Sequence, residues 1–353
     1  MLSFLIAYTL RPRLAGALGC NENGFHTQRV TVMTGIRGRT SGASGRSFPR
    51  PARLACAAGL LAVATAAAAC GVAGSDVNDN ARVIRVVAAE NFWGSIASQV
   101  GGSHVQVTSI ITNPNADPHS YEPTAADART IASARLVIEN GIGYDPWVGR
   151  LVAADRGQRI SVLDVGNTLG VAGGGNPHRW YNPADVRAIV ERLAADYSKL
   201  DPTDRAYFAR RRALFLSVGL HKYYDLIGAI RAKYGGTPVG ASESIFAMMA
   251  PALGLKLITP PGFLRAISEG TEVSAADKQT IDNQIRHHLI KIYVYNSQNV
   301  TPDVRTQLAA AEAANIPVAR ITETLSPPTD TFQDWQIRQL DGIQGALASA
   351  SGG

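Results

Sequence analysis

The segment that decides the fold runs from residue 202 to residue 234 and reads PTDRAYFARRRALFLSVGLHKYYDLIGAIRAKY. It contains no proline after its first residue. Apolar and aromatic residues recur along it at the spacing of one helical face: Tyr223, Ile227, Ile230 and Tyr234. These 33 residues would extend over about 50 Å as a helix. Because a crossover inside one small sheet needs far less length, we expect a stiff helix over 201–235 that links two lobes and resists wide hinge bending.

Short β-branched runs stand on both sides of this segment and alternate with helical patterns. The runs before it are VIRVVA (83–88), VQVTSII (105–111), RLVIE (135–139) and RISVLD (159–164). The runs after it are TPVGA (237–241), KLIT (256–259), KIYVY (291–295) and PVARIT (317–322). The helical patterns cover 125–134, 244–254, 274–288, 302–314 and the tail from residue 332.

Alternation of strands and helices is typical of βαβ units and parallel sheets. We therefore predict an α/β protein of two lobes, each with a parallel sheet flanked by helices, joined by a long rigid helix. The lobes are expected at 83–200 and 236–353, on either side of the linking helix.

Charge divides the chain unevenly. The 353 residues carry a formal charge of +6, but residues 1–69 hold eight arginines and only one acid, Glu22. The remainder is therefore close to neutral, with one acid in excess. Because nucleic-acid binding needs a net basic face, the folded part is not expected to bind nucleic acid.

Residues 1–69 read as an N-terminal extension that ends in a signal peptide. Three arginines precede the uncharged run LACAAGLLAVATAAAA (54–69), which is short for a membrane-spanning helix. The small residues before Cys70 resemble a bacterial lipobox, and this resemblance implies cleavage before Cys70 and a lipid on its sulfur. An ordinary signal peptide with an incidental cysteine is the alternative. Residues 70–82 are polar and read as a tether, and no cysteine follows Cys70.

Two histidines occupy proline-bracketed loops that follow predicted strands. His119 lies in DPHSYEPT (117–124), before a helix that we expect Thr124 to cap, and His178 lies in NPHRWYNP (176–183). Ligands of open α/β sheets bind at the carboxyl ends of the strands, where such loops lie. Taken singly, each histidine reads more readily as an ordinary loop residue, but two matching contexts at corresponding ends of successive βα units single out the pair as candidate ligands.

Here the chain resembles the metal-binding solute-binding proteins of ABC importers for zinc and manganese, the zinc-uptake A type. The two histidine loops are similar to that family's ligand loops in its first lobe. GASESIFAMMAPALGL (240–255) is similar to its second-lobe ligand segment, with Glu243 in the ligand position. ARITETLSP (319–327) is similar to the segment that supplies an acidic ligand, usually aspartate, and Glu323 stands there. The resemblance thus implies four metal ligands: His119, His178, Glu243 and Glu323.

Two imidazoles and two carboxylates suit Zn²⁺ or Mn²⁺, and the lack of thiolate argues against Cu(I). Glutamate in place of a histidine favours the harder manganese, although zinc binds more tightly to most such sites. Four protein ligands leave no open position for activated water, so we expect no enzyme activity. The resemblance implies an extracytoplasmic lipoprotein, held to the membrane at Cys70, that carries the metal as cargo to an ABC permease and its ATPase subunit. We expect it to act as a monomer.

Two other functions remain open on the sequence alone. A secreted metalloenzyme could use Glu243 or Glu323 as a general base beside two histidines, and it would show a metal-bound water and turnover. A surface adhesin could keep the scaffold without binding metal.

Overall fold

The computed structural model describes residues 83–114, 116, 120–155 and 159–352. All of them belong to one compact unit, Ala73–Gly353. The expected signal peptide, lipidated Cys70 and tether lie outside the described residues, and so does His119. Within the described part of the chain, no helix combines the length and the apolar character needed to cross a bilayer.

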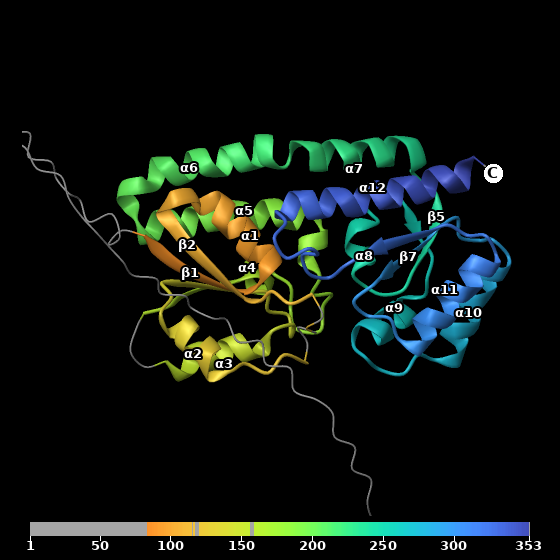
Figure 1. The fold of residues 1–353 in the computed structure, drawn as a ribbon, viewed down its shortest axis with the longest axis horizontal. Coiled ribbons are helices and arrows are strands. Elements are labelled where there is room, and N and C mark those ends of the chain that lie inside the picture. The colour runs from red at the N-terminus through yellow and green to blue at the C-terminus, as the bar shows by residue number, and fades with distance from the viewer. Residues whose placement is uncertain (1–82, 115, 117–119, 156–158, 353) are drawn as a thin grey trace, which may run out of the picture. The chain divides into compact units, whose positions relative to one another are not determined.

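The first sheet has four parallel strands in the order β2-β1-β3-β4 (Figure 1). Its strands are β1 (Ile84–Glu90), β2 (Val105–Ile111), β3 (Leu136–Glu139) and β4 (Ser161–Asp164). The helices of this part are α1 (Asn91–Gly101), α2 (Ala125–Ala132), α3 (Pro146–Ala154), α4 (Val165–Leu169) and α5 (Pro183–Leu200). We call the sheet and these helices the first lobe.

The second sheet repeats the same parallel arrangement, in the order β6-β5-β7-β8. Its strands are β5 (Pro238–Ala241), β6 (Lys256–Leu257), β7 (Tyr293–Asn296) and β8 (Val318–Ile321). Its helices are α8 (Phe246–Met249), α9 (Pro261–Ser268), α10 (Ala275–Arg286), α11 (Pro302–Ala313) and α12 (Phe332–Ser351). This second lobe confirms the predicted α/β class of two parallel sheets.

The segment that links the two sheets is helical, as predicted, but it is not one regular helix. A 3₁₀ turn over Pro202–Asp204 leads into α6 (Arg205–Leu214), and α7 (His221–Tyr234) follows after a π-helical turn over Phe215–Gly219. At this turn Leu220 N donates to Phe215 O at 2.8 Å, five residues back. A π turn inserts one extra residue into the helical ladder, so the helix can shift its register and still face the core. The predicted face of α7 is buried: Tyr223, Ile227, Ile230 and Tyr234.

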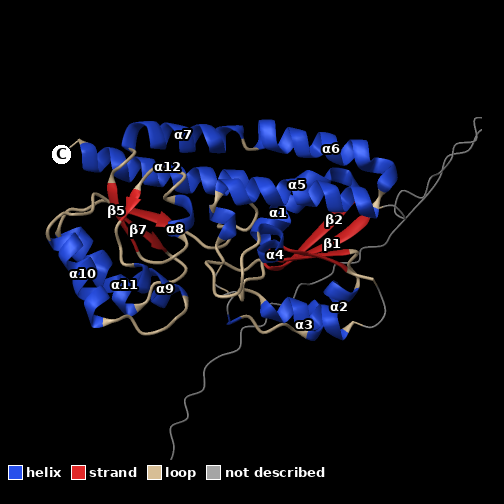
Figure 2. Ribbon diagram, turned by 180° about the vertical axis from the view of Figure 1, so that it is seen from behind, coloured by secondary structure: helices blue, strands red, loops and turns tan. Residues whose placement is uncertain are grey.

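Helices cover both sheets, and one helical layer is common to the two. Figures 1 and 2 show α6 and α7 running past both sheets, with α12 returning beside α7. The largest apolar cluster includes Val86 of β1, Tyr223 of α7, Val239 of β5 and Trp335 of α12. The two lobes therefore share one continuous core. Smaller clusters bury α2 and α3 against the first sheet and α9, α10 and α11 against the second.

Two local predictions have different outcomes. Thr124 caps α2 as expected: its hydroxyl accepts from Asp127 N at 3.2 Å, and Thr124 N donates to the Asp127 carboxylate at 2.7 Å. The helix expected over 244–254 is wrong in length, because α8 covers only Phe246–Met249 and turns follow it. Pro251 has no N–H to continue the helical ladder, which explains the early end.

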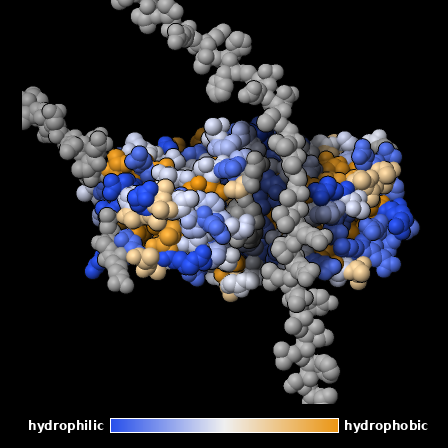
Figure 3. Space-filling view, turned by 60° about the horizontal axis from the view of Figure 1, so that its bottom comes forward, coloured by the Kyte–Doolittle hydropathy of each residue, from blue (hydrophilic) through white to orange (hydrophobic). Residues whose placement is uncertain are grey.

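Figure 3 shows hydrophilic residues gathered at the end of the molecule that carries α10 and α11.

Candidate metal centre between the lobes

Three neighbouring strands of the second sheet end in polar residues. Glu243 follows β5 by two residues, Asn296 is the last residue of β7, and Glu323 follows β8 by two residues. Because the strands are parallel and adjacent in the order β5-β7-β8, these side chains emerge at the same edge of the sheet. All three are buried, at 1%, 0% and 8% exposed.

The amide of Asn296 lies between the two carboxylates. Its Nδ2 donates to Glu243 Oε1 at 2.5 Å and to Glu323 Oε2 at 3.1 Å. Asn299 Nδ2 donates to the other oxygen of Glu243, Oε2, at 2.8 Å. Buried carboxylates are unfavourable unless donors or cations compensate them, and these amides supply part of that compensation.

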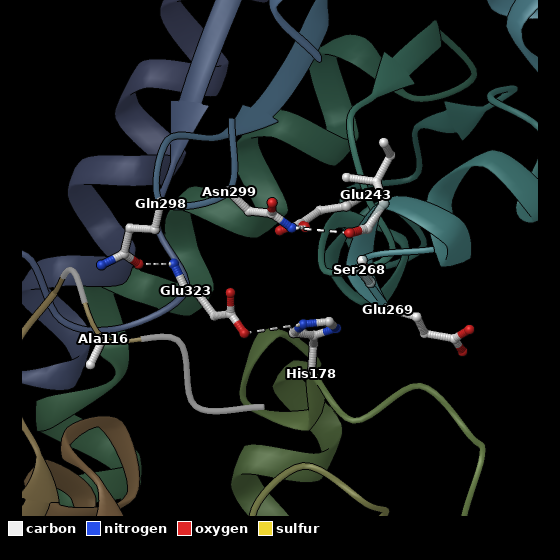
Figure 4. A pocket seen from close by; sticks show the side chains of 10 residues that line it. Ala116, His178, Glu243, Ser268, Glu269, Gln298, Asn299 and Glu323 are labelled. Carbon is white, nitrogen blue, oxygen red and sulfur yellow. Dashed lines mark hydrogen bonds and ion pairs between the residues drawn. The ribbon is translucent and has the colours of Figure 1, made fainter. Parts of the chain in front are cut away.

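Residues of the first lobe reach across to Glu323. The hydroxyl of Tyr144 donates to Glu323 Oε1 at 2.8 Å, and His178 Nε2 lies 3.6 Å from the same oxygen. The second distance is longer than a hydrogen bond. Figure 4 shows the imidazole and this carboxylate pointing toward one another from different lobes.

The loop around His178 fixes the orientation of its ring. His178 Nδ1 lies 2.9 Å from Asn176 Oδ1, which also accepts from His178 N at 3.1 Å. Asn176 Nδ2 in turn donates to Ser244 O in the second lobe at 2.7 Å. Nδ1 thus faces an oxygen that can only accept, which favours the tautomer with its proton on Nδ1 and turns Nε2 toward the cavity as the atom that could bind a cation. The rings of Tyr144 and Trp180 lie edge-on to the imidazole.

The backbone that carries Glu323 is held by Gln298. The side-chain oxygen of Gln298 accepts from Glu323 N at 2.6 Å and from Thr324 N at 2.9 Å. Its Nε2 donates to Thr324 Oγ1 at 2.9 Å. Glu323 is thus oriented at its backbone by the loop after β7, as well as at its carboxylate.

A cavity of about 350 Å³ opens at this place. It is lined by Ala116, His178, Glu243, Ile267, Ser268, Glu269, Gly270, Gln298, Asn299 and Glu323. Glu269 is an exposed residue, and Figure 4 shows its carboxylate directed away from Glu323. This volume is large enough for a hydrated ion and lies at the lower end of the range of small-molecule pockets, about 300–1,000 Å³.

The described structure thus brings three of the four predicted ligands to one cavity. His178 and Glu323 face each other, and Glu243 stands beyond the Asn296 amide. Within the described residues, no three side chains of His, Cys, Asp or Glu are grouped closely enough to hold a metal ion. The fourth predicted ligand, His119, is outside the described residues, so its role as a metal ligand stays a prediction.

Sequence reasoning missed the neutral residues of the site. Asn296, Gln298 and Asn299 were not singled out, and neither was Tyr144. A signal for the first three was present, because they directly follow the predicted strand at 291–295, in the position where Glu243 and Glu323 follow theirs. Tyr144 carried no such signal, since its contact with Glu323 joins residues 179 positions apart.

The other histidines in the described part of the chain do not line the cavity. His104 Nδ1 lies 2.8 Å from Asp204 and its ring stacks on Tyr207, while His221 pairs with Asp225 on the exposed side of α7. His287 and His288 follow α10 and are exposed.

Acidic side chains cluster beneath the first-lobe half of the site. Glu90, at the end of β1, is fully buried, and this burial together with the charge of Asp145 raises its pKa well above the usual range. Burial also raises the pKa of Asp145 to about 6, although N–H groups of Asn140 and Gly141 oppose the shift. Burial, followed by the charges of Asp145 and Asp164, raises the pKa of Glu139 to about 7.

The raised pKa of Glu139 predicts a stability that falls with pH. Its pKa lies at about 7 in the folded protein, against an ordinary value of 4.5, so the unfolded chain ionises first as the pH rises. Stability from this group is complete below about pH 4.5 and is lost as the pH rises through about 7. We therefore expect Glu139→Gln to stabilise the protein more at about pH 8 than at about pH 5 in urea unfolding. Parallel pH profiles for Glu139→Gln and wild type would contradict this, and the exposed Glu312→Gln serves as the control.

The fold is that of an α/β protein with two parallel sheets, and polar residues that follow the strands line a cavity of the kind that a binding protein uses. The family model for the zinc-uptake complex component A, periplasmic, matches residues 86–346. The chain is 24% identical over 162 residues to the manganese-binding lipoprotein MntA of Halalkalibacterium halodurans, covering 44% of this chain and 53% of that protein. The match thus spans about half of that relative's length.

A second relative is the iron-binding protein YfeA of Yersinia pestis, 24% identical over 242 residues, covering 65% of this chain and 72% of that protein. Among solved structures, the periplasmic metal-binding protein of Candidatus Liberibacter asiaticus has the same fold. Its TM-score is 0.63 at 21% identity, over 75% of this chain and 99% of that one.

The chain belongs to the family of periplasmic zinc-uptake component A proteins. Members of this family are metal-binding transport proteins rather than enzymes, so the chain is a solute-binding component of a metal uptake system. Family membership also implies an extracytoplasmic location.

Proposed function

We propose that the chain captures a divalent transition metal, zinc or manganese, with His119, His178, Glu243 and Glu323 and delivers it to a membrane permease. The observation that carries the proposal is the distance of 3.6 Å between His178 Nε2 and Glu323 Oε1. Two donors on one tetrahedral ion, with bonds of about 2.1 Å, stand about 3.4 Å apart. The pair thus has close to the spacing that a shared ion requires.

The charge of the site supports the same cargo. Glu243 and Glu323 are both almost fully buried. Among the described residues, the side-chain donors that contact them include neutral amides and a phenol, and an imidazole lies nearby. Two carboxylates can neutralise a divalent ion, which makes such an ion a better occupant than an anion. Imidazole with carboxylate suits zinc, manganese or iron, and relatives are named for binding manganese and iron.

The proposed site is shared between the lobes, which gives a route for release. We propose lobes over 83–200 and 236–353 and a link over 201–235, so that His119 and His178 come from one lobe and both glutamates from the other. Separating the lobes would remove the carboxylates from the ion. The continuous core under α7 and α12 resists wide opening, so we expect small displacements to be enough.

Glu243→Ala tests the ligand set. We expect it to lower the affinity for zinc and manganese by more than about 100-fold, since losing even a residue that only supports a ligand costs 10–100-fold. The matched control is Glu269→Ala, which removes a carboxylate that lines the same cavity but is directed away from Glu323. Competitive titration measures both variants, and circular dichroism checks their fold. If Glu243→Ala binds zinc and manganese as tightly as the wild type does, Glu243 is not a metal ligand.

The proposal extends to how the protein is held in place. Cys70 follows an uncharged run and small residues, as in lipoproteins, and one relative is named a lipoprotein. We propose that Cys70 carries a lipid, that residues 1–69 are removed, and that residues 70–82 tether the lobes at the outer face of the membrane. The partners are then an ABC permease and its ATPase subunit.

Cys70→Ala separates the anchored form from a secreted one. We expect the wild type to fractionate with membranes and to begin at a lipidated Cys70 by mass spectrometry. The variant should leave the membrane fraction, because the proposed site of lipid attachment has been removed. A wild-type protein that begins elsewhere, or carries an unmodified Cys70, contradicts the anchor and leaves the metal site untouched.

A further inference from the structure

Asn296 is placed by strand order rather than by sequence proximity to the glutamates. Its strand, β7, pairs with β5 on one side and with β8 on the other, and these two strands lead into Glu243 and Glu323. The side chain at the end of the middle strand therefore stands between the other two. It is fully buried, and its Nδ2 donates to both carboxylates.

The amide cannot turn over without losing a second set of contacts. Asn296 Oδ1 accepts from Gln298 N at 3.0 Å, and turning the amide over would break this bond. The backbone N–H of Asn296 donates to Ser242 Oγ at 3.1 Å and holds the main chain in place, whichever way the amide faces. An amide with its oxygen held by a backbone N–H must present its NH₂ group to the other side. The donor that faces the glutamates is thus built into the loop after β7.

Asn296 holds one oxygen of each carboxylate, and the other oxygen of each has a contact of its own. Glu323 Oε2 accepts from Asn296, whereas Oε1 accepts from Tyr144 and is the oxygen nearest His178. Glu243 Oε1 accepts from Asn296, and Oε2 accepts from Asn299. If either glutamate turned both oxygens toward one ion, it would pull an oxygen away from the Asn296 amide.

We propose, on the basis of the metal-binding function proposed above, that Asn296 is a positioning residue that limits Glu243 and Glu323 to one metal-binding oxygen each. Its chemical consequence is selectivity. Two imidazoles and two single carboxylate oxygens give four donors, the number that zinc adopts in most protein sites. Manganese is better served by six oxygen-rich positions, which bidentate carboxylates would help to supply.

The glutamate ligands and the Asn296 amide have opposite effects on the choice between manganese and zinc, and a substitution can separate the two effects. Glutamate as a ligand favours the harder manganese, whereas a fixed amide between the two glutamates restricts how many oxygens they offer. Removing the amide should therefore favour manganese relative to zinc without changing any ligand residue.

The test compares wild type, Asn296→Ala and Asn296→Asp by competitive titration of zinc against manganese. Asn296→Asp keeps an acceptor for Gln298 N but replaces the shared donor with an oxygen. We expect the ratio of the manganese Kd to the zinc Kd to fall by about tenfold or more in both variants. X-ray absorption of the manganese-loaded variants should show more oxygen neighbours than in manganese-loaded wild type. Asn283→Ala, which removes an amide on α10 away from the cavity, should keep the wild-type ratio.

The outcomes separate this inference from the proposed function. An unchanged ratio in either folded variant overturns the role of Asn296, even if both affinities fall together. If neither variant folds by circular dichroism, zinc-loaded wild type decides: single-oxygen binding by both glutamates supports the inference, and bidentate binding overturns it. His178→Ala is titrated alongside, and zinc binding that does not depend on His178 would instead overturn the proposed metal site.

Discussion

The contact of Glu323 with the first lobe is the interaction on which the site depends. A buried carboxylate from one lobe meets the hydroxyl of Tyr144 and the imidazole of His178 from the other. Burying such a charge is unfavourable without a partner, and each lobe alone supplies only part of the compensation. The arrangement is thus stable only when the two sheet edges face one another, which couples the state of the lobes to the occupancy of the site.

The helical layer formed by α6, α7 and α12 restricts how far the two lobes can move apart. Because α7 and α12 pack on each other and share one apolar cluster with both sheets, the lobes cannot separate widely without exposing that core. The π turn at Phe215–Gly219 separates α6 from α7, with Phe208 of α6 buried on one side of it and the apolar face of α7 buried on the other. A stiff link and a buried polar contact together favour small displacements of the lobes over a wide hinge-bending closure.

Much of the fold could be predicted from the sequence because its signals are local. Each β-branched run became a strand, and the periodic face of Tyr223 and Ile230 became a buried helical face. The length of α8 was mispredicted because a local signal, Pro251, was overlooked. Tertiary structure decides the role of Asn296, because this role depends on β7 lying between β5 and β8, an order that no spacing in the chain encodes. His178 was singled out by its proline-bracketed loop, and Glu243 and Glu323 were found through a family resemblance, whereas the neutral residues that orient them were not found.

The account makes a direct structural claim: one cation is shared by imidazole from the first lobe and carboxylate from the second. A crystal structure of the zinc-loaded protein, with anomalous diffraction data at the zinc edge, tests it most directly. The account predicts a single strong peak within about 2.2 Å of His178 Nε2 and of oxygens of Glu243 and Glu323, with the His119 imidazole as the fourth donor. A peak elsewhere, or His119 and His178 too far apart to share an ion, would contradict it.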